Sequence, residues 1–297
     1  MMKEEFSTYH PLVNFLYFAM VIGFSMVFTH PACLLISITC ALAYSIYINR
    51  KKAVRFNLLY MLPMFAATAL INPAFNHEGG TILMYLRDGN PLTLESILYG
   101  ISAASIMISV ITWFSCFNAV ISSDKFVYLF GRIIPALSLV LSMALRLVPR
   151  FKAQIKVISN AQKCVGRDVS NGGIMQRAKN GIRILSVMVT WALENAIETA
   201  DSMKSRGYGL KGRSAFSLYR FDRRDAGVTT IIMLCGAYVV AGYLTGGLYW
   251  RYFPTAKGRP LDLYAASIYI AYFLLCITPV IINVREGIKW RRLRQKI

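Results

Sequence analysis

Residues 96–121 read SILYGISAASIMISVITWFSCFNAVI and contain no Asp, Glu, Lys or Arg. A helix needs about 20 apolar residues to cross the roughly 30 Å hydrocarbon core of a bilayer, so this run predicts a transmembrane helix. Five further apolar runs predict the same, at about 12–28, 32–48, 56–72, 227–250 and 261–283. The sequence therefore predicts an all-α, polytopic integral membrane protein with about six transmembrane helices.

The composition combines apolar and basic character. Of the 297 residues, 56% are hydrophobic and 16% charged, and the formal net charge is +19. Soluble domains are about 45–50% apolar with about a quarter of residues charged, so a compact soluble enzyme, a disordered tail protein and a disulfide scaffold all fit poorly. The six cysteines show no Cys-x-x-Cys spacing and the three histidines are scattered, so we expect no disulfide framework and no metal site.

The positions of lysine and arginine predict the orientation. Cytoplasmic loops of membrane proteins carry an excess of these residues. Residues 1–55 contain 5 of them, 56–121 contain 1, 122–226 contain 18, 227–260 contain 3 and 284–297 contain 6. This alternation predicts that both termini of a multi-pass protein in the cell membrane face the cytoplasm.

The predicted spans lack ionisable groups in their interiors; Asp262 lies at the end of its span. Ion-coupled carriers and intramembrane enzymes usually hold such groups at membrane depth. Their absence disfavours both, although a self-sufficient secondary transporter and an intramembrane enzyme remain alternatives. No catalytic residues are predicted.

Between the fourth and fifth spans, residues 126–226 form a basic region for which we expect two long helices. The first is predicted from near Pro149 to Lys163 and the second from about Ile174 to Ser205. In the second, Ala192, Ala196, Ala200 and Met203 share one face, which predicts a close crossing with another helix.

A second face of the same helix carries carboxylates. Glu194, Glu198 and Asp201 follow at i, i+4 and i+7, and like charges at this spacing repel unless cations pair with them. Arg146, Arg150 and Arg183 are the predicted partners, with a solvated acidic face as the alternative.

Both helices are predicted to end at a glycine next to an arginine. Gly166 precedes Arg167, and Gly207 follows Arg206. Glycine adopts the left-handed conformation that ends many helices, and arginine binds carboxylates or carbonyls through its planar fork. Two such exposed basic ends, 41 residues apart, predict a pair of docking points for a two-fold partner.

These residues resemble the transmembrane T component of energy-coupling factor (ECF) transporters, the CbiQ-like family of cobalt and nickel permease relatives, over nearly the whole chain. The family has Ala-Arg-Gly signatures at the ends of two cytoplasmic coupling helices. The stretch Ala200-Asp201-Ser202-Met203-Lys204-Ser205-Arg206-Gly207 is similar to the second signature, with Ser205 in place of alanine. The first, Ala161-Gln162-Lys163-Cys164-Val165-Gly166, has Val165 in place of the arginine, although Arg167 follows.

The resemblance implies a division into membrane helices one to four (1–125), a cytoplasmic platform of coupling helices (126–226), and helices five and six with a basic tail (227–297). It also implies an importer of vitamins or other micronutrients. The residues expected to dock the ATPases are those of the two helix ends, namely Cys164, Val165, Gly166, Arg167, Ser205, Arg206 and Gly207. Those expected to support them are Arg146, Arg150, Ala161, Gln162, Glu194, Glu198, Ala200, Asp201 and Met203.

The implied partners are two cytosolic ABC-type ATPases and a membrane substrate-binding S component. The chain has no Gly-x-x-x-x-Gly-Lys-Ser/Thr phosphate loop, so ATP and magnesium are expected in the partners, with no cofactor bound here. The basic region also raises a nucleic-acid binder as an alternative. Because positive-inside topology already accounts for the charge, we expect no nucleic-acid partner.

Overall fold

The computed structural model describes residues 4–85, 90–131, 135–170, 172–210, 219–260 and 262–295. The chain divides into two compact units. One consists of Met1–Lys125 and Tyr219–Ile297, and the other of Phe126–Leu218.

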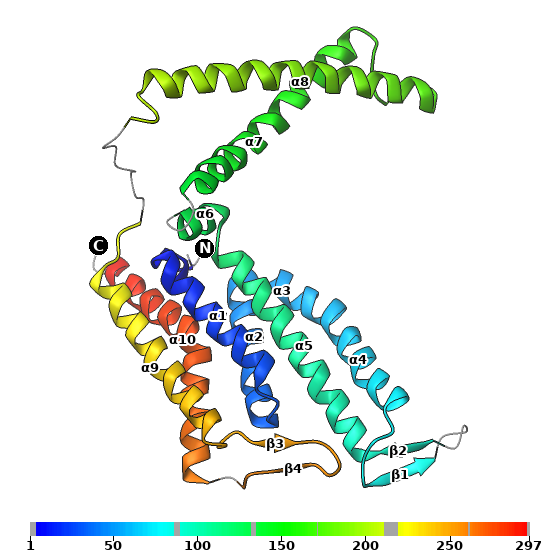
Figure 1. Ribbon diagram of the computed structural model, residues 1–297, viewed down its shortest axis with the longest axis vertical. Helices are drawn as coiled ribbons and strands as arrows, with labels where there is room; N and C mark the ends of the chain where they lie inside the picture. Colours follow the sequence, from blue (N-terminus) through cyan, green and yellow to red (C-terminus); the bar gives the residue numbers. More distant parts are fainter. Residues whose placement is uncertain are drawn as a thin grey trace. The chain divides into compact units, whose positions relative to one another are not determined.

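The first unit is a bundle of helices with two short hairpins (Figure 1). Its helical elements are η1 (Phe6–Thr8), α1 (Pro11–Val27), α2 (Pro31–Asn49), α3 (Lys51–Phe56), the π-helical η2 (Asn57–Met61), α4 (Leu62–Phe75), α5 (Leu94–Val120), α9 (Arg223–Leu244) and α10 (Leu263–Arg294). The antiparallel hairpins are β1 (Ile82–Tyr85) with β2 (Pro91–Thr93), and β3 (Trp250–Arg251) with β4 (Lys257–Gly258).

Five helical segments of the described chain are long and apolar enough to cross a membrane. They are α2, the continuous segment Lys51–Phe75, α5, α9 and α10. These confirm five of the predicted spans, and α5 contains the whole charge-free core from residue 96 to residue 120. The other, α1, is apolar but has 17 residues, slightly fewer than the other five. The fold is thus all-α and polytopic, as predicted.

Histidine and proline together start the first two long helices. Pro11 and Pro31 occupy the first turns, where a missing N–H has no cost. The ring nitrogen Nδ1 of His30 accepts a hydrogen bond from the Ala32 amide at 3.2 Å, and His10 Nδ1 accepts one from Leu12 at 3.2 Å. Histidine thus acts as the N-cap that satisfies an otherwise free amide.

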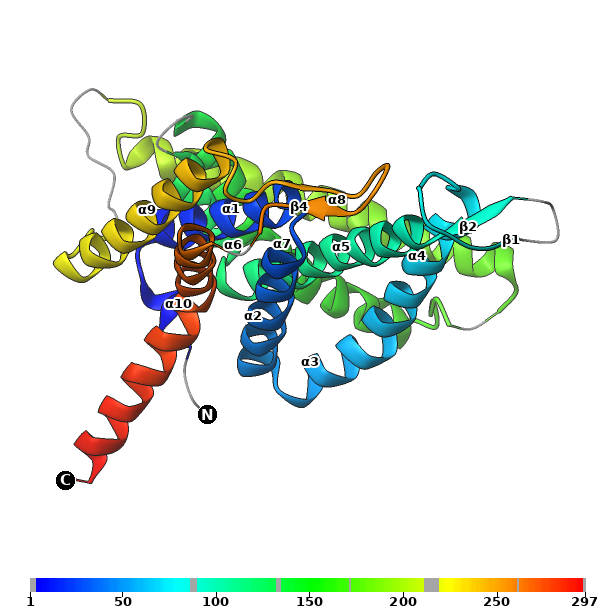
Figure 2. The same cartoon turned by 90° about the horizontal axis from the view of Figure 1, so that it is seen from below.

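The core of the bundle contains buried polar groups that find partners inside it. In Figure 2, α2 lies beside α5 and α10, and it contacts both. The fully buried Trp113 of α5 donates from Nε1 to Ser37 Oγ of α2 at 3.1 Å. Ser37 Oγ also lies 2.7 Å from Ser25 Oγ of α1. Because unpaired polar groups are costly in an apolar core, these bonds fix three helices in one arrangement.

One end of this bundle carries the N-terminal segment. The two hairpins lie at the opposite end from η1 and the end of α10 (Figure 1). The buried Lys125 donates from Nζ to the Val120 carbonyl at 2.9 Å and to the Ser7 carbonyl. The His10 amide donates to Asp225 Oδ1 at 3.2 Å. The N-terminal segment is therefore held by residues of both stretches of the unit, Lys125 at the end of the first and Asp225 near the start of the second.

The second unit contains two long helices, α7 (Pro135–Cys164) and α8 (Ile174–Ser205). The short α6 (Ser123–Gly131) precedes α7 along the chain. The predicted bounds of α8 are confirmed, but the predicted start of the first helix was wrong, because α7 begins at Pro135 and continues through Pro149. An internal proline removes one helical hydrogen bond and crowds the preceding turn, a local cost that neighbouring helical turns can absorb.

Candidate functional site

Helices α7 and α8 pack through a small apolar contact. Ile158 of α7 and Ile184 and Met188 of α8 are buried, and Phe151 and Trp191 pack against them. The Phe151 and Trp191 rings meet edge to face, with centroids 5.5 Å apart and planes at 72°. Beside this contact, Arg150 Nη1 donates to Asn195 Oδ1 at 3.3 Å. The two helices are therefore held together by an apolar contact and a hydrogen bond beside it.

The small-residue face that was predicted to cross another helix is not the face by which α8 contacts α7. Ala196 and Ala200 are exposed, and Met203 is half-buried. The contact instead uses Ile184, Met188 and Trp191, nearer the middle of the helix. Larger apolar side chains bury more surface than alanine does, and this difference favours their face over the small-residue stripe.

The end of α7 is a Schellman cap. Gly166 has φ +73°, in the left-handed region. Its amide donates to the Lys163 carbonyl at 3.0 Å, while the Arg167 amide donates to the Gln162 carbonyl at 2.9 Å. This pair of bonds satisfies helix-end carbonyls that would otherwise have no partner, and it confirms the predicted glycine stop.

The end of α8 repeats the same geometry. Gly207 has φ +74°. Its amide donates to the Lys204 carbonyl at 2.9 Å, and the Tyr208 amide donates to the Met203 carbonyl at 3.0 Å. The second predicted glycine stop is therefore also confirmed.

The matching hydrogen bonds align the two ends residue by residue. Cys164 corresponds to Ser205, Val165 to Arg206 and Gly166 to Gly207. Arg167, one place beyond the glycine, corresponds to Tyr208. All of these except the half-buried Gly207 are exposed. The first end thus presents an apolar side chain, 65% exposed at Val165, where the second presents a guanidinium.

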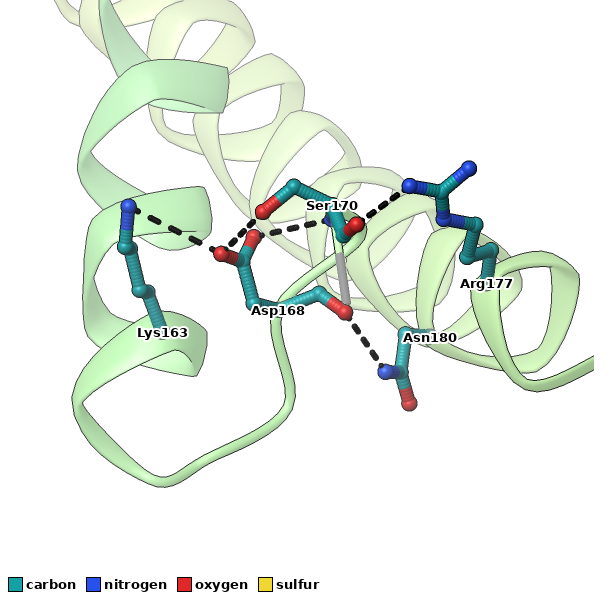
Figure 3. A network of polar contacts seen from close by, with 5 residues as sticks. All are labelled: Lys163, Asp168, Ser170, Arg177 and Asn180. Carbon is teal, nitrogen blue, oxygen red and sulfur yellow. Dashed lines mark hydrogen bonds and ion pairs between the residues drawn. The ribbon is translucent and has the colours of Figure 1, made fainter. Parts of the chain in front are cut away.

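A polar network closes the loop that follows the first end (Figure 3). Asp168 accepts hydrogen bonds from the Ser170 amide at 3.2 Å and from its hydroxyl, and lies 3.6 Å from Lys163 Nζ. From α8, Asn180 Nδ2 donates to the Asp168 carbonyl at 2.9 Å and Arg177 donates to the Ser170 carbonyl. The loop is therefore tied to the end of α7 and to the first turns of α8.

The charge on Asp168 is stabilised by this network. The hydrogen bond from the Ser170 hydroxyl, followed by that from the Ser170 amide, holds the pKa of Asp168 below its usual value. These residues were not predicted from the sequence. An aspartate that binds the amide two residues on forms an Asx turn, so Asp168-Val169-Ser170 was the signal that could have found them.

The predicted pairing of the acidic face of α8 was wrong. Glu194, Glu198 and Asp201 are exposed. Within the described ranges, the ion pairs are Lys163–Asp168 and Lys289–Glu286. Helical spacing correctly placed the three carboxylates on one face but could not tell whether cations lie near them. They form the solvated acidic face that was the alternative.

Of the remaining predicted supporting residues, Gln162 belongs to the first cap. Its carbonyl accepts the Arg167 amide, and its side-chain Oε1 is buried without a partner among the described residues. Arg146 and Ala161 are exposed. Arg150 braces α7 against α8 through Asn195 rather than pairing with a carboxylate.

A further feature of α8, not predicted from the sequence, is an exposed apolar stripe. Its members follow at spacings of three and four residues and are 67%, 61%, 58% and 61% exposed: Ile182, Leu185, Val189 and Leu193. We call them the α8 stripe. Helical periodicity was the signal, because this spacing puts the residues on one face. Large exposed apolar patches mark surfaces that bind proteins or membranes.

These observations define the class of protein. It is a multi-pass α-helical membrane protein whose second unit carries two capped helix ends and an exposed apolar stripe. The family model CbiQ, described as cobalt transport protein, matches residues 7–217. Because this match covers most of the chain, the protein belongs to the CbiQ family.

Similar proteins include several named "Energy-coupling factor transporter transmembrane protein EcfT". The one from Lactobacillus helveticus is 35% identical over 106 residues, which is 35% of this chain and 38% of the relative. The one from Bacillus selenitireducens is 33% identical over 112 residues, covering 37% and 42% respectively. The chain therefore spans about two fifths of the length of these relatives.

Proposed function

We propose that the chain is the transmembrane coupling subunit of an ATP-driven ECF-type importer of vitamins or other micronutrients. It would transmit the motions of two cytosolic ABC-type ATPases to a separate membrane subunit that binds the substrate. ATP and magnesium would be bound by the ATPases, and both termini of this chain would face the cytoplasm. The EcfT names of its relatives support this assignment.

The observation that carries the proposal is the repeated cap at the ends of α7 and α8. Each presents a left-handed glycine turn with basic residues beside it, in matching hydrogen-bond geometry. Equivalent grooves on two related ATPases would accept equivalent ends. We assign Arg206 to a carboxylate or carbonyl of one ATPase and Val165 to an apolar part of the corresponding groove, with Arg167 supplying charge at its edge.

The α8 stripe is the proposed contact for the substrate-binding subunit. Its four side chains are large, apolar and exposed, whereas other faces of α8 carry carboxylates and cations. Burial of such side chains is worth about 1.5–3 kcal/mol each. A membrane subunit with an apolar cytoplasmic edge would match this surface.

Coupling would follow from the presence of both contacts on one helix. Val189 and Arg206 are 17 residues apart in α8 and its cap, or about 25 Å at 1.5 Å per residue. When ATP brings the ATPases together, motion at the end of α8 would move the stripe. Such coupling requires that each partner bind the two positions of the helix with different affinity.

The first test is Arg206→Glu in the assembled complex. Loss of a buried charge pair costs about 2–5 kcal/mol, so we expect at least about a tenfold weaker retention of the ATPase at the end of α8 and a matching loss of uptake. Lys152→Glu makes the same charge change on an exposed part of α7 and should leave ATPase retention unchanged. Unchanged retention and uptake in Arg206→Glu would contradict the docking assignment.

The first end is tested in the same assay. Arg167→Glu together with Arg206→Glu should remove the retention left by Arg206→Glu alone if Arg167 takes part in docking. If the double variant retains as much ATPase as Arg206→Glu alone, Arg167 takes no part in docking. Val165 would then be the docking residue at the end of α7.

A further inference from the structure

An open crevice lies where α2 meets α3, at the end of two membrane-spanning segments. Its volume is about 590 Å³, and it is lined by Ile46, Arg50, Lys51, Val54, Arg55 and Leu58. Most of this lining is apolar, with cationic groups among it. A crevice of mixed character at the end of a span lies where lipid headgroups meet acyl chains.

The charge around the crevice has one sign. Residues 6–77 contain no Asp or Glu, and their Lys and Arg residues are Arg50, Lys51, Lys52 and Arg55. All four are exposed. The ion pairs of the described chain involve none of them. No ion pair among the described residues therefore neutralises these four cations.

The backbone at Arg50 brings the two helices together. Arg50 is at once the C-cap of α2 and the N-cap of α3, with φ +46° and ψ −124°. Its amide donates to the Ile46 carbonyl at 2.8 Å, and its carbonyl accepts from the Val54 amide at 3.1 Å. A single residue thus turns the chain, so that apolar residues of α2 and α3 face a shared space with cations at its edge.

The apolar lining distinguishes a lipid from a free anion. Ile46, Val54 and Leu58 are 43%, 46% and 69% exposed, and phosphate alone would leave them uncovered. Arginine and lysine bind phosphate groups, and basic pockets between transmembrane helices bind anionic lipid headgroups. Charge complementarity and the apolar lining therefore favour a single ligand that has both an anionic group and an apolar chain.

We propose that this crevice binds an anionic phospholipid, with its headgroup phosphate on Arg50, Lys51 and Arg55 and an acyl chain along Ile46, Val54 and Leu58. The bound lipid would neutralise the junction between α2 and α3 and hold Lys51–Phe75 at a fixed depth in the bilayer. The proposal does not depend on the ATPase docking assigned to the ends of α7 and α8.

The test measures lipid binding to the purified full-length chain in detergent by native mass spectrometry. The probes are dioleoyl-phosphatidylglycerol, dioleoyl-phosphatidylcholine and inorganic phosphate. The variant Arg50→Gln/Lys51→Gln/Arg55→Gln removes three charges from the crevice. The matched control, Lys152→Gln/Lys156→Gln/Lys179→Gln, removes three exposed charges from α7 and α8 of the second unit. Helical circular dichroism and a single gel-filtration peak verify that both variants fold.

We expect one phosphatidylglycerol per chain, bound at least about tenfold more weakly by the crevice variant and within about twofold of wild type by the control. Phosphatidylcholine should bind more weakly than phosphatidylglycerol, and inorganic phosphate should compete poorly. A second variant, Val54→Ser/Leu58→Ser, keeps every charge and should also weaken phosphatidylglycerol binding.

Three results would overturn the proposal. Equal losses in the crevice and control variants would indicate diffuse surface charge. Competition by inorganic phosphate at the lipid's own concentration would indicate a free-anion site. In the third result, the crevice variant binds lipid as well as wild type does but loses a protein partner from the assembled complex. The cations would then bind an acidic protein surface.

Discussion

At the scale of single residues, glycine ends both α7 and α8 for the same physical reason. A left-handed backbone places a Cβ too close to the neighbouring carbonyl, at a cost of roughly 1–2 kcal/mol. Gly166 has open space around its Cα, whereas a Cβ on Gly207 would lie 2.9 Å from Leu210 Cδ1, at the movable end of that side chain. Backbone conformation rather than crowding therefore requires glycine at these positions.

Gly166→Ala should consequently lower the local opening free energy of the first cap by about 1 kcal/mol. Amide hydrogen exchange at Arg167 measures this change. Gly181→Ala is the matched control, because Gly181 lies inside α8 without a positive φ, and a Cβ added there would meet no atom within 4 Å. Alanine is the better helix former there, so the control should stabilise α8 by up to about 1 kcal/mol. An unchanged exchange rate in Gly166→Ala would contradict the left-handed cap.

Asp168 predicts a dependence of the first loop on pH. Its pKa is lowered in the folded state by the Ser170 hydrogen bonds. The stabilisation is therefore fully present above the unfolded-state pKa, near 3.8, and is lost as the pH falls through the lower folded-state value. Exchange protection of the Ser170 amide, corrected for intrinsic rates, should be constant from neutral pH down to this range and then decrease. Asp168→Asn should remove the dependence, and a dependence retained by that variant would exclude Asp168 as its source.

At the scale of elements, the sequence predicted what depends on local chemistry. The ends of both helices followed from Gly166 and Gly207, since a left-handed glycine stop is local. The start of α7 could not be predicted from Pro149, because proline is compatible with a first turn and also with a kinked interior. The face by which α8 contacts α7 depends on the area that Ile184 and Met188 bury, which is a tertiary property.

The contact between α7 and α8 can be tested with two isoleucines on one helix. Ile184 is 7% exposed and Ile182 is 67% exposed. Ile184→Ala should lower the free energy of unfolding of the second unit by about 2–4 kcal/mol through lost burial and the cavity left behind. Ile182→Ala should change it by no more than about 0.5 kcal/mol in the purified chain. Denaturant titration followed by Trp191 fluorescence measures both, and equal effects would contradict the assigned contact face.

At the scale of the whole molecule, hydrophobic runs predicted the membrane-spanning class because the bilayer sets the length of a crossing helix. The proposed partner surfaces were harder to predict from the sequence. The basic helix ends were visible in the sequence as Arg206-Gly207 and Gly166-Arg167. The α8 stripe was not distinguished from a packed face, because periodicity identifies a helix face without telling whether it is covered.

The proposed coupling requires that α8 hold two partners through separate residues, and a paired co-purification experiment measures this directly. In the assembled complex, Val189→Glu should release the substrate-binding subunit and retain the ATPases, because it places a charge in an apolar contact. Arg206→Glu should release an ATPase and retain the substrate-binding subunit, and both variants should lose uptake. Retention of both partners by either variant, or loss of the same partner by both, would contradict the account.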